Sequence, residues 1–310
     1  MARPGIREYL LLLLLALMWG SSFSFIKIGV HAYSPLVVAS GRLAIGALVL
    51  WVFVALRGNG LPRGRRPLVS AFAVGLLGNA VPFFLISYGE TKINAGLAAI
   101  LMSVVPLTTV ALAHFVTNDE KLTTGKVVGI VLGTIGVIVL VGPETLGWLG
   151  GDLPYQMAVL VAAICYAIAA LIARNLRDQP RAGAAAVILS FASVMTIPFA
   201  LMLDQPWAMP WDAGGFYAIL YLGLFPTGLA MFLILLLIAR AGASFVAFNN
   251  YLVPAIGVVT GFVILAEIPA PSSIMALIII LAGIAASQMR RKSRPKEAKN
   301  TVDIVDKKQK

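Results

Sequence analysis

The chain has 310 residues, of which 60% are hydrophobic and only 12% are charged, and its formal net charge is +11. A soluble domain carries about 25% charged residues and has no core large enough for so much apolar surface, so the composition excludes a soluble globular protein and predicts a protein that uses lipid as its solvent. The single cysteine, Cys165, excludes an internal disulfide. The sequence shows no nucleotide-binding, hydrolase or metal-ligating motif, so we expect no enzymatic activity, no cofactor and no metal.

Ten apolar stretches are long enough to cross a hydrocarbon layer about 30 Å thick, which needs about 20 apolar residues per helix. They cover about 8–30, 35–56, 67–89, 93–116, 124–142, 153–175, 182–203, 213–239, 243–265 and 270–289. The first stretch could be mistaken for a signal peptide. No small-x-small cleavage site follows it, and nine further stretches do, so we expect a retained helix.

An internal repeat organises these stretches, because the pattern of 95–136 recurs at 243–283. Each copy is an apolar run with a central proline, an acidic stop at Asp119 or Glu267, and a second apolar run. The identical pairs include Ala95 and Ala243, Ala99 and Ala247, Val105 and Val253, Pro106 and Pro254, and Val110 and Val258. Five helices per copy is an odd number, so the second copy would enter the membrane upside down. The predicted fold is an all-α membrane protein with ten transmembrane helices in two inverted five-helix repeats.

The basic residues predict the orientation of the chain. All but three of the 24 Lys and Arg fall in the termini and in the loops of one side, which is the pattern of cytoplasmic segments. The three exceptions are Lys27, Arg42 and Lys92. We therefore expect a multi-pass protein of a bacterial inner membrane with both termini cytoplasmic, and no nucleic-acid partner. The predicted parts are an N-terminus at 1–7, a first repeat at 8–142, a periplasmic linker at 143–152, a second repeat at 153–289 and a basic tail at 290–310. This tail is expected to be a disordered anchor against anionic lipid.

The first helix of each half carries the same pair of side chains. Trp19 and Lys27 are eight positions apart, as are Tyr166 and Arg174, so each aromatic ring shares a helix face with a cation. Inverted repeats place a binding site near the membrane midplane, between the halves. A single chain with two fused repeats already supplies its own pseudo-dimer partner, so we expect a functional monomer.

At these residues the sequence resembles a known family. Trp19-Gly20-Ser21-Ser22-Phe23 with Lys27 resembles the first-helix signature of the drug/metabolite transporter superfamily, in its EamA-type branch. Arg42 stands where that family often has an arginine. The stretch from Tyr88 to Asp119-Glu120 resembles the one that closes its fourth helix, although Asn118-Asp119-Glu120 and Ala266-Glu267 depart from the usual Gly-Glu. Within the branch the chain is most similar to the YddG-type amino-acid exporters, so the resemblance implies an inner-membrane exporter of amino acids.

The candidate substrate-binding residues are polar or aromatic side chains whose position within a span is not explained by contact with lipid. They are Trp19, Ser22, Asn79, Phe83, Tyr88, Met102, Tyr166, Asn250 and Tyr251. An amide in lipid is costly unless it is hydrogen-bonded, so Asn249 and Asn250 predict either a wet cavity or a hydrogen bond between helices. The cavity is favoured for Asn250 and the helix contact for Asn249.

Two cations and four prolines are candidates for moving parts. Lys27 and Arg42 could attract or gate a substrate carboxylate at the outer mouth, or their long side chains could simply reach the interface. The prolines inside spans are Pro82, Pro106, Pro226 and Pro254. Each removes a backbone hydrogen bond, which makes it either a hinge or a fixed bend. The spacing of Gly125, Gly129 and Gly133 predicts close helix packing within the chain.

The acidic residues bear on the source of energy. All 13 fall in loops, tails or the last turn of a span, so no carboxylate is expected at depth. The sequence therefore favours export of amino acids or related small amphipathic metabolites by alternating access, through facilitated diffusion or exchange. The alternative is a proton-coupled exporter of drugs or other metabolites. A channel or a scaffold is a further, weaker alternative.

Overall fold

A computed structural model describes residues 5–58, 60–116, 123–141 and 152–288 of the chain. Within these ranges every regular element is a helix and none is a strand, which confirms the predicted all-α class. The expected N-terminal residues 1–4, the acidic turn at Asp119, most of the linker 143–152 and the basic tail 290–310 lie outside the described residues.

The helices of the first half follow the expected spans, some of them in two or three pieces. They are α1 (Ile6–Ala32), α2 (Pro35–Arg57), α3 (Arg65–Gly75), the π-helix η1 (Leu76–Ala80), α4 (Val81–Glu90), α5 (Ala95–Met102), α6 (Val105–Val116) and α7 (Thr124–Val141). The described helices of the second half are α9 (Leu153–Ala173), η2 (Arg174–Leu176), α10 (Arg181–Phe199), η3 (Ala200–Asp204), η4 (Pro206–Ala208), α11 (Ala213–Leu222), η5 (Gly223–Leu229), α12 (Ala230–Ala241), α13 (Ala243–Val246), α14 (Asn249–Leu265) and α15 (Pro271–Gln288).

Seven helical stretches are long and apolar enough to cross a membrane. They are Ile6–Ala32, Pro35–Arg57, Arg65–Glu90, Ala95–Val116, Leu153–Leu176, Arg181–Asp204 and Ala213–Ala241. Three shorter apolar helices, Thr124–Leu140, Asn249–Leu265 and Pro271–Ser287, coincide with the remaining expected spans. Ten crossings in two inverted repeats thus remain a prediction.

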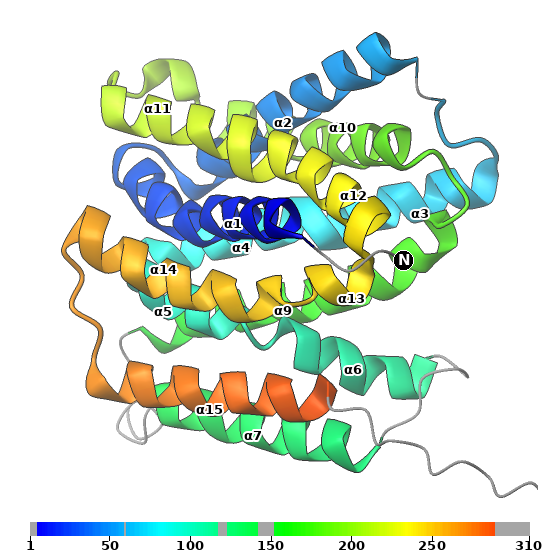
Figure 1. Ribbon diagram of the computed structural model, residues 1–310. Helices are drawn as coiled ribbons and strands as arrows, with labels where there is room; N and C mark the ends of the chain where they lie inside the picture. The colour runs from blue at the N-terminus through cyan, green and yellow to red at the C-terminus, as the bar shows by residue number, and fades with distance from the viewer. Residues whose placement is uncertain (1–4, 59, 117–122, 142–151, 289–310) are drawn as a thin grey trace, which may run out of the picture.

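The two halves pack through matching sets of helices. The first helix of the first half, α1, packs on α11 and α14, and the first helix of the second half, α9, packs on α4, α5 and α6. In the same way α2 packs on η5, α10 packs on α3, and α7 lies along α15 (Figure 1). Each helix pair between the halves therefore has a counterpart in which the two halves exchange roles.

The contact between α7 and α15 depends on glycine. A Cβ atom on Gly129 would lie 2.6 Å from the carbonyl oxygen of Gly283, and one on Gly283 would lie 2.8 Å from the carbonyl oxygen of Gly129. Only a residue without a side chain allows backbones to approach this closely. The close packing predicted for this helix within the chain is confirmed at Gly129.

Apolar side chains cover the outside of the bundle as well as its interior. On α1, Leu15 is fully buried, whereas Leu10, Leu13, Leu14 and Leu17 are exposed. A helix that is hydrophobic all round belongs in a membrane, because water would not tolerate the exposed side. The exposed leucines therefore face lipid.

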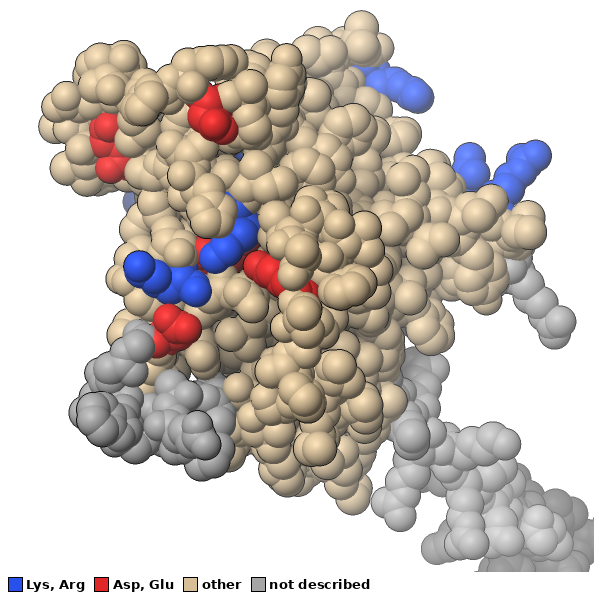
Figure 2. Space-filling model, turned by 90° about the vertical axis from the view of Figure 1, so that its left-hand side faces the viewer, with Lys and Arg blue, Asp and Glu red and all other residues tan. Residues whose placement is uncertain are grey.

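The bundle has two ends, which are named here after one residue each. The Lys27 end holds the C-terminus of α1 and the start of α2, and lies at the left of Figure 1. The Glu8 end holds the start of α1, on the opposite side. Figure 2 looks onto the Lys27 end and shows basic and acidic side chains gathered near its centre.

Candidate functional site

Two π-helices, η1 and η5, interrupt long helices of the first and the second half. In η5 the N–H of Ala230 donates to the carbonyl of Phe225, one residue further back than the α-helical partner Pro226. Pro226 itself has no N–H, which weakens the α-helical pattern at this place. The wide turn leaves the Pro226 carbonyl free to accept a bond from outside the helix.

Trp19 of α1 uses this free carbonyl. Its indole Nε1–H donates to the oxygen of Pro226 at 3.0 Å, across the boundary between the halves. Trp19 is half-buried, as expected for a large amphipathic ring in the middle of a helix. The structure therefore places the predicted site residue Trp19 against the predicted hinge residue Pro226.

Arg42 of α2 binds the next residue of the same π-helix. Its Nε and Nη2 atoms both donate to the hydroxyl oxygen of Thr227, each at 3.2 Å. The Thr227 hydroxyl in turn donates to the carbonyl of Leu222 at 2.8 Å. The guanidinium carbon lies 3.9 Å from the centre of the Phe83 ring, which is a close cation–π contact.

The charge of Arg42 has little compensation. The residue is only 5% exposed, and the partner oxygen on Thr227 is neutral. No carboxylate lies within 4.0 Å of it among the described residues, and its electrostatic neighbours are Tyr166 and, farther away, Glu90. A guanidinium has five N–H donors and remains protonated, so a buried one is strongly attracted to an anion. An anionic group such as a carboxylate would supply the missing partner.

Four predicted side chains thus lie around η5 and the neighbouring helices. They are Trp19 of α1, Arg42 of α2, Phe83 of α4 and Tyr166 of α9. We call these four residues with Thr227 the central site. The sequence predicted all of them except Thr227. A threonine directly after the proline of a broken helix is the signal that could have revealed it.

The other predicted substrate residues lie apart from the central site. Ser22 donates back to the Trp19 carbonyl at 2.6 Å, and the amide of Asn79 donates to Val74 at 3.3 Å, so both serve their own helices. Tyr88 is exposed and stacks on Tyr155, with the two ring centres 5.0 Å apart.

Three further predicted residues make no side-chain hydrogen bond within the described part of the chain. Met102 and Tyr251 are half-buried and pack against the main core, and Asn250 is half-buried. Asn249 is 2% exposed, and its Oδ1 atom has no hydrogen-bond partner among the described residues. The preference for Asn250 as a cavity residue and Asn249 as a helix contact remains a prediction.

The four prolines have different surroundings. Pro82 lies in the first turn of α4, directly after η1, and Pro226 lies inside η5. The matched pair is less alike, because Pro106 starts α6 after a break in the helix whereas Pro254 lies inside the unbroken α14. Whether any of them is a hinge remains a prediction.

At the Lys27 end, the sequence missed a buried carboxylate. The ammonium group of Lys27 donates to the backbone carbonyls of Glu90 at 2.7 Å and Ile93 at 2.9 Å. The side chain of Glu90 is completely buried, and neither of its oxygens has a hydrogen-bond partner among the described residues.

The expectation that no carboxylate lies at depth is therefore wrong. Glu90 does occupy the last turn of its helix, as expected from its position in the sequence. A side chain at a helix end normally reaches the interface, but here α1, α9 and the start of α5 pack around α4 and enclose it. Lys27 binds one carbonyl at the end of α4 and one in the turn before α5, and whether it attracts or gates a substrate carboxylate remains a prediction.

Metal binding has no obvious place in this arrangement. Within the described ranges no three His, Cys, Asp or Glu side chains come together as metal ligands would. The central site holds a guanidinium, a hydroxyl and aromatic rings, which suit an organic anion better than a cation.

Known proteins with similar sequences are transporters. The model of the EamA-like transporter family matches residues 6–142 and again residues 153–288. A probable amino-acid metabolite efflux pump of Salmonella typhimurium is 27% identical over 90% of this chain and 93% of its own. A probable terminal-alkyne amino-acid exporter of Streptantibioticus cattleyicolor is 24% identical over 93% and 95%. The inner membrane transporter YedA of Escherichia coli is 29% identical over 80% and 79%.

One solved crystal structure has a similar fold, with a TM-score of 0.66 at 18% identity over 93% of this chain and 97% of the other. The two matches of one family model coincide with the two halves whose helices pair in the structure. This multi-pass membrane protein belongs to the EamA-like transporter family.

Proposed function

We propose that the chain exports amino acids or related small amphipathic metabolites across the inner membrane by alternating access. The two five-helix halves would be inverted repeats with the central site between them. The Lys27 end would face the periplasm, and both termini would lie in the cytoplasm. The two exporters named for amino acids among the relatives support the substrate class, and the paired helices support the architecture.

The observation that carries the proposal is the buried, uncompensated charge of Arg42. A neutral hydroxyl and a ring face leave the guanidinium short of an anion in a low-dielectric membrane. The carboxylate of an amino acid would supply that anion. The aromatic rings of Phe83, Trp19 and Tyr166 would suit apolar or neutral substrate side chains.

The test is counterflow of labelled amino acids into liposomes that contain the purified protein. Saturable counterflow of neutral or apolar amino acids is expected. The amines that correspond to these amino acids without their carboxylate should not compete. Flux that does not saturate would indicate a channel, and equal competition by the amines would contradict a carboxylate site at Arg42.

The variant Arg42→Gln should weaken the apparent affinity roughly 30-fold or more, because losing one partner of a buried charged pair costs about 2 kcal/mol or more. Arg42→Lys should recover part of this, since it restores the charge but not the planar fork. The matched control is Arg57→Gln. Arg57 lies on the same helix and also faces a ring, that of Phe53 at 5.6 Å, but it is exposed. Its loss should leave counterflow unchanged.

A second candidate is a proton-coupled exporter of drugs or other metabolites, which is favoured by the buried Glu90. The two candidates share a central site and differ in substrate range. Competition by cationic drugs that lack a carboxylate would favour the second candidate.

A further inference from the structure

Glu90 is a buried acidic side chain that the proposed site does not use. Glu90 and Ser87 lie one turn apart on α4, and Lys27 and Ser24 lie one turn apart on α1. Neither serine hydroxyl has a hydrogen-bond partner among the described residues, and neither does the side-chain oxygen of Gln156 on α9. Several buried polar groups on the helices that pack together here thus lack a partner.

An ionised carboxylate does not fit the arrangement seen here. Both oxygens of Glu90 lack a donor, although an ammonium group lies on the backbone carbonyl of the same residue. Leaving a buried carboxylate without hydrogen bonds costs several kcal/mol, whereas the neutral acid costs far less. The structure therefore shows the surroundings of a protonated Glu90.

The charged groups around Glu90 allow both the protonated and the ionised state of its carboxyl group. Lys27 from α1 and Arg42 from α2 favour an ionised carboxylate, and Glu267 from the segment before α15 opposes it. From α9, which packs on α4, Tyr155 stacks on Tyr88 and carries no charge at neutral pH. With the positive charge of Lys27 already in place, a second cation such as sodium is disfavoured, so the ligand that remains is a proton.

Lys27 links the protonation state of Glu90 to the contacts that close the Lys27 end. Its ammonium has three N–H donors, of which two tie α1 to the carbonyls of Glu90 and Ile93 at the junction of α4 and α5. When Glu90 loses its proton, the new carboxylate attracts the ammonium away from those neutral carbonyls. The tie between α1 and the α4–α5 junction is then released.

We propose that Glu90 is a proton-binding residue which couples export to an inward flow of protons, with Lys27 as the group that transmits its state to the Lys27 end. This inference rests on the proposed function. In each cycle the carboxylate takes one proton from the periplasm and releases one proton to the cytoplasm. No other covalent bond forms or breaks.

The test begins with a measurement that needs no substrate. Infrared spectra of the full chain in lipid vesicles should contain the C=O band of a protonated carboxylic acid at neutral pH, and the band should disappear as the pH is raised. It should be absent from Glu90→Gln and present in Glu8→Gln, which removes a more accessible carboxylate. Absence of the band from the unaltered protein, or its persistence in Glu90→Gln, overturns the inference whatever the transport result.

The second measurement uses vesicles loaded with a pH-sensitive dye and a mixture of neutral amino acids. Net efflux of amino acids from vesicles that contain the unaltered protein should be accompanied by proton movement in the opposite direction, and an imposed pH gradient should drive accumulation. Glu90→Gln should lose this accumulation, and Glu90→Asp should recover part of it. A sodium gradient alone should have no effect.

The outcomes separate the two proposals. Net efflux of amino acids without proton movement, or accumulation driven by sodium, overturns proton coupling and leaves the proposed function intact. No counterflow with any amino acid, together with the carboxylic acid band of Glu90, overturns the proposed function while supporting the proton site.

Discussion

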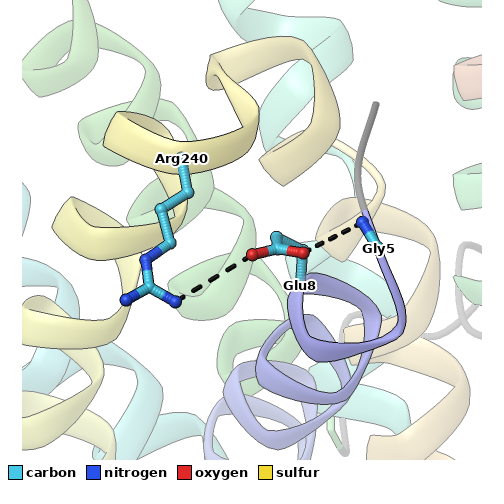
Figure 3. A network of polar contacts seen from close by, with 3 residues as sticks. All are labelled: Gly5, Glu8 and Arg240. Carbon is cyan, nitrogen blue, oxygen red and sulfur yellow. Dashed lines mark hydrogen bonds and ion pairs between the residues drawn. The ribbon is translucent and has the colours of Figure 1, made fainter. Parts of the chain in front are cut away.

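The two ends of the bundle each combine a glutamate with a cation, and they use the combination differently. At the Glu8 end, Glu8 and Arg240 approach to 4.0 Å, with 51% of the arginine side chain exposed, and Glu8 also accepts a bond from the N–H of Gly5 at 2.9 Å (Figure 3). At the Lys27 end, Glu90 is enclosed and Lys27 binds backbone carbonyls instead of the carboxylate.

The difference shows how burial decides what a charged pair can do. An exposed pair is screened by water and salt, so its loss matters little. A buried pair is expensive in either state, which makes the position of one proton decisive. A third glutamate, Glu267, lies half-buried at the Lys27 end, as Glu8 does at the other end, and permits a further test.

The largest effect is expected from Lys27→Met. It leaves the carbonyls of Glu90 and Ile93 without their donor, and each buried acceptor left unsatisfied costs about 1–3 kcal/mol. Unfolding of the purified protein in detergent measures the loss. Lys92→Met is the control, because Lys92 is exposed at the same end. The double variant Lys27→Met with Glu90→Gln should lose less than the sum of the single variants, and strict additivity would show that the two side chains are not coupled.

A moderate effect is expected from Glu267→Gln. The Glu267 carboxylate accepts bonds from the backbone N–H groups of Ala95 at 3.1 Å and Gly96 at 3.4 Å, and so caps α5 from the other half of the chain. Loss of the charge should cost about 1 kcal/mol, as for other helix caps. Hydrogen exchange at Ala95 and Gly96 should become faster. Asp212→Asn, at the cap of α11, should leave these two amides unaffected.

The smallest effect is expected from Glu8→Gln and Arg240→Gln. Each should change the free energy of unfolding by less than about 1 kcal/mol, and the difference should shrink as salt is added. Unfolding at low and high salt measures it. A large loss that is insensitive to salt would mean that this end is as tightly organised as the other, and the comparison would fail.

Much of the fold could be predicted from the sequence, because lipid imposes simple rules. Apolar length marks a helix, and the small residue at Gly129 marks a close contact. Trp19 was also recognisable as a site candidate, since a large ring in the middle of a span is far from the interface. Arg42 was expected at the outer mouth or reaching the interface, and its burial against Thr227 and Phe83 could not be predicted from its place in the sequence.

The rest depends on contacts between distant segments. The burial of Glu90 results from the packing of α1 and α9, and the role of Thr227 results from a π-helical turn, which no hydropathy pattern reveals. The matched prolines also have different surroundings. Pro106 lies at the start of a helix, where a proline is tolerated because its missing N–H would have no partner there, whereas Pro254 lies inside a helix.

The bond between Trp19 and Pro226 links the winding of one helix to the position of another. If η5 rewound into a regular α-helix, the N–H of Ala230 would turn from the Phe225 carbonyl to the Pro226 carbonyl, and this oxygen would move with the changed pitch. A carbonyl oxygen has two lone pairs, so the indole could keep its bond only by following the oxygen. A change of helical pitch in the second half would therefore shift α1 of the first half through one hydrogen bond.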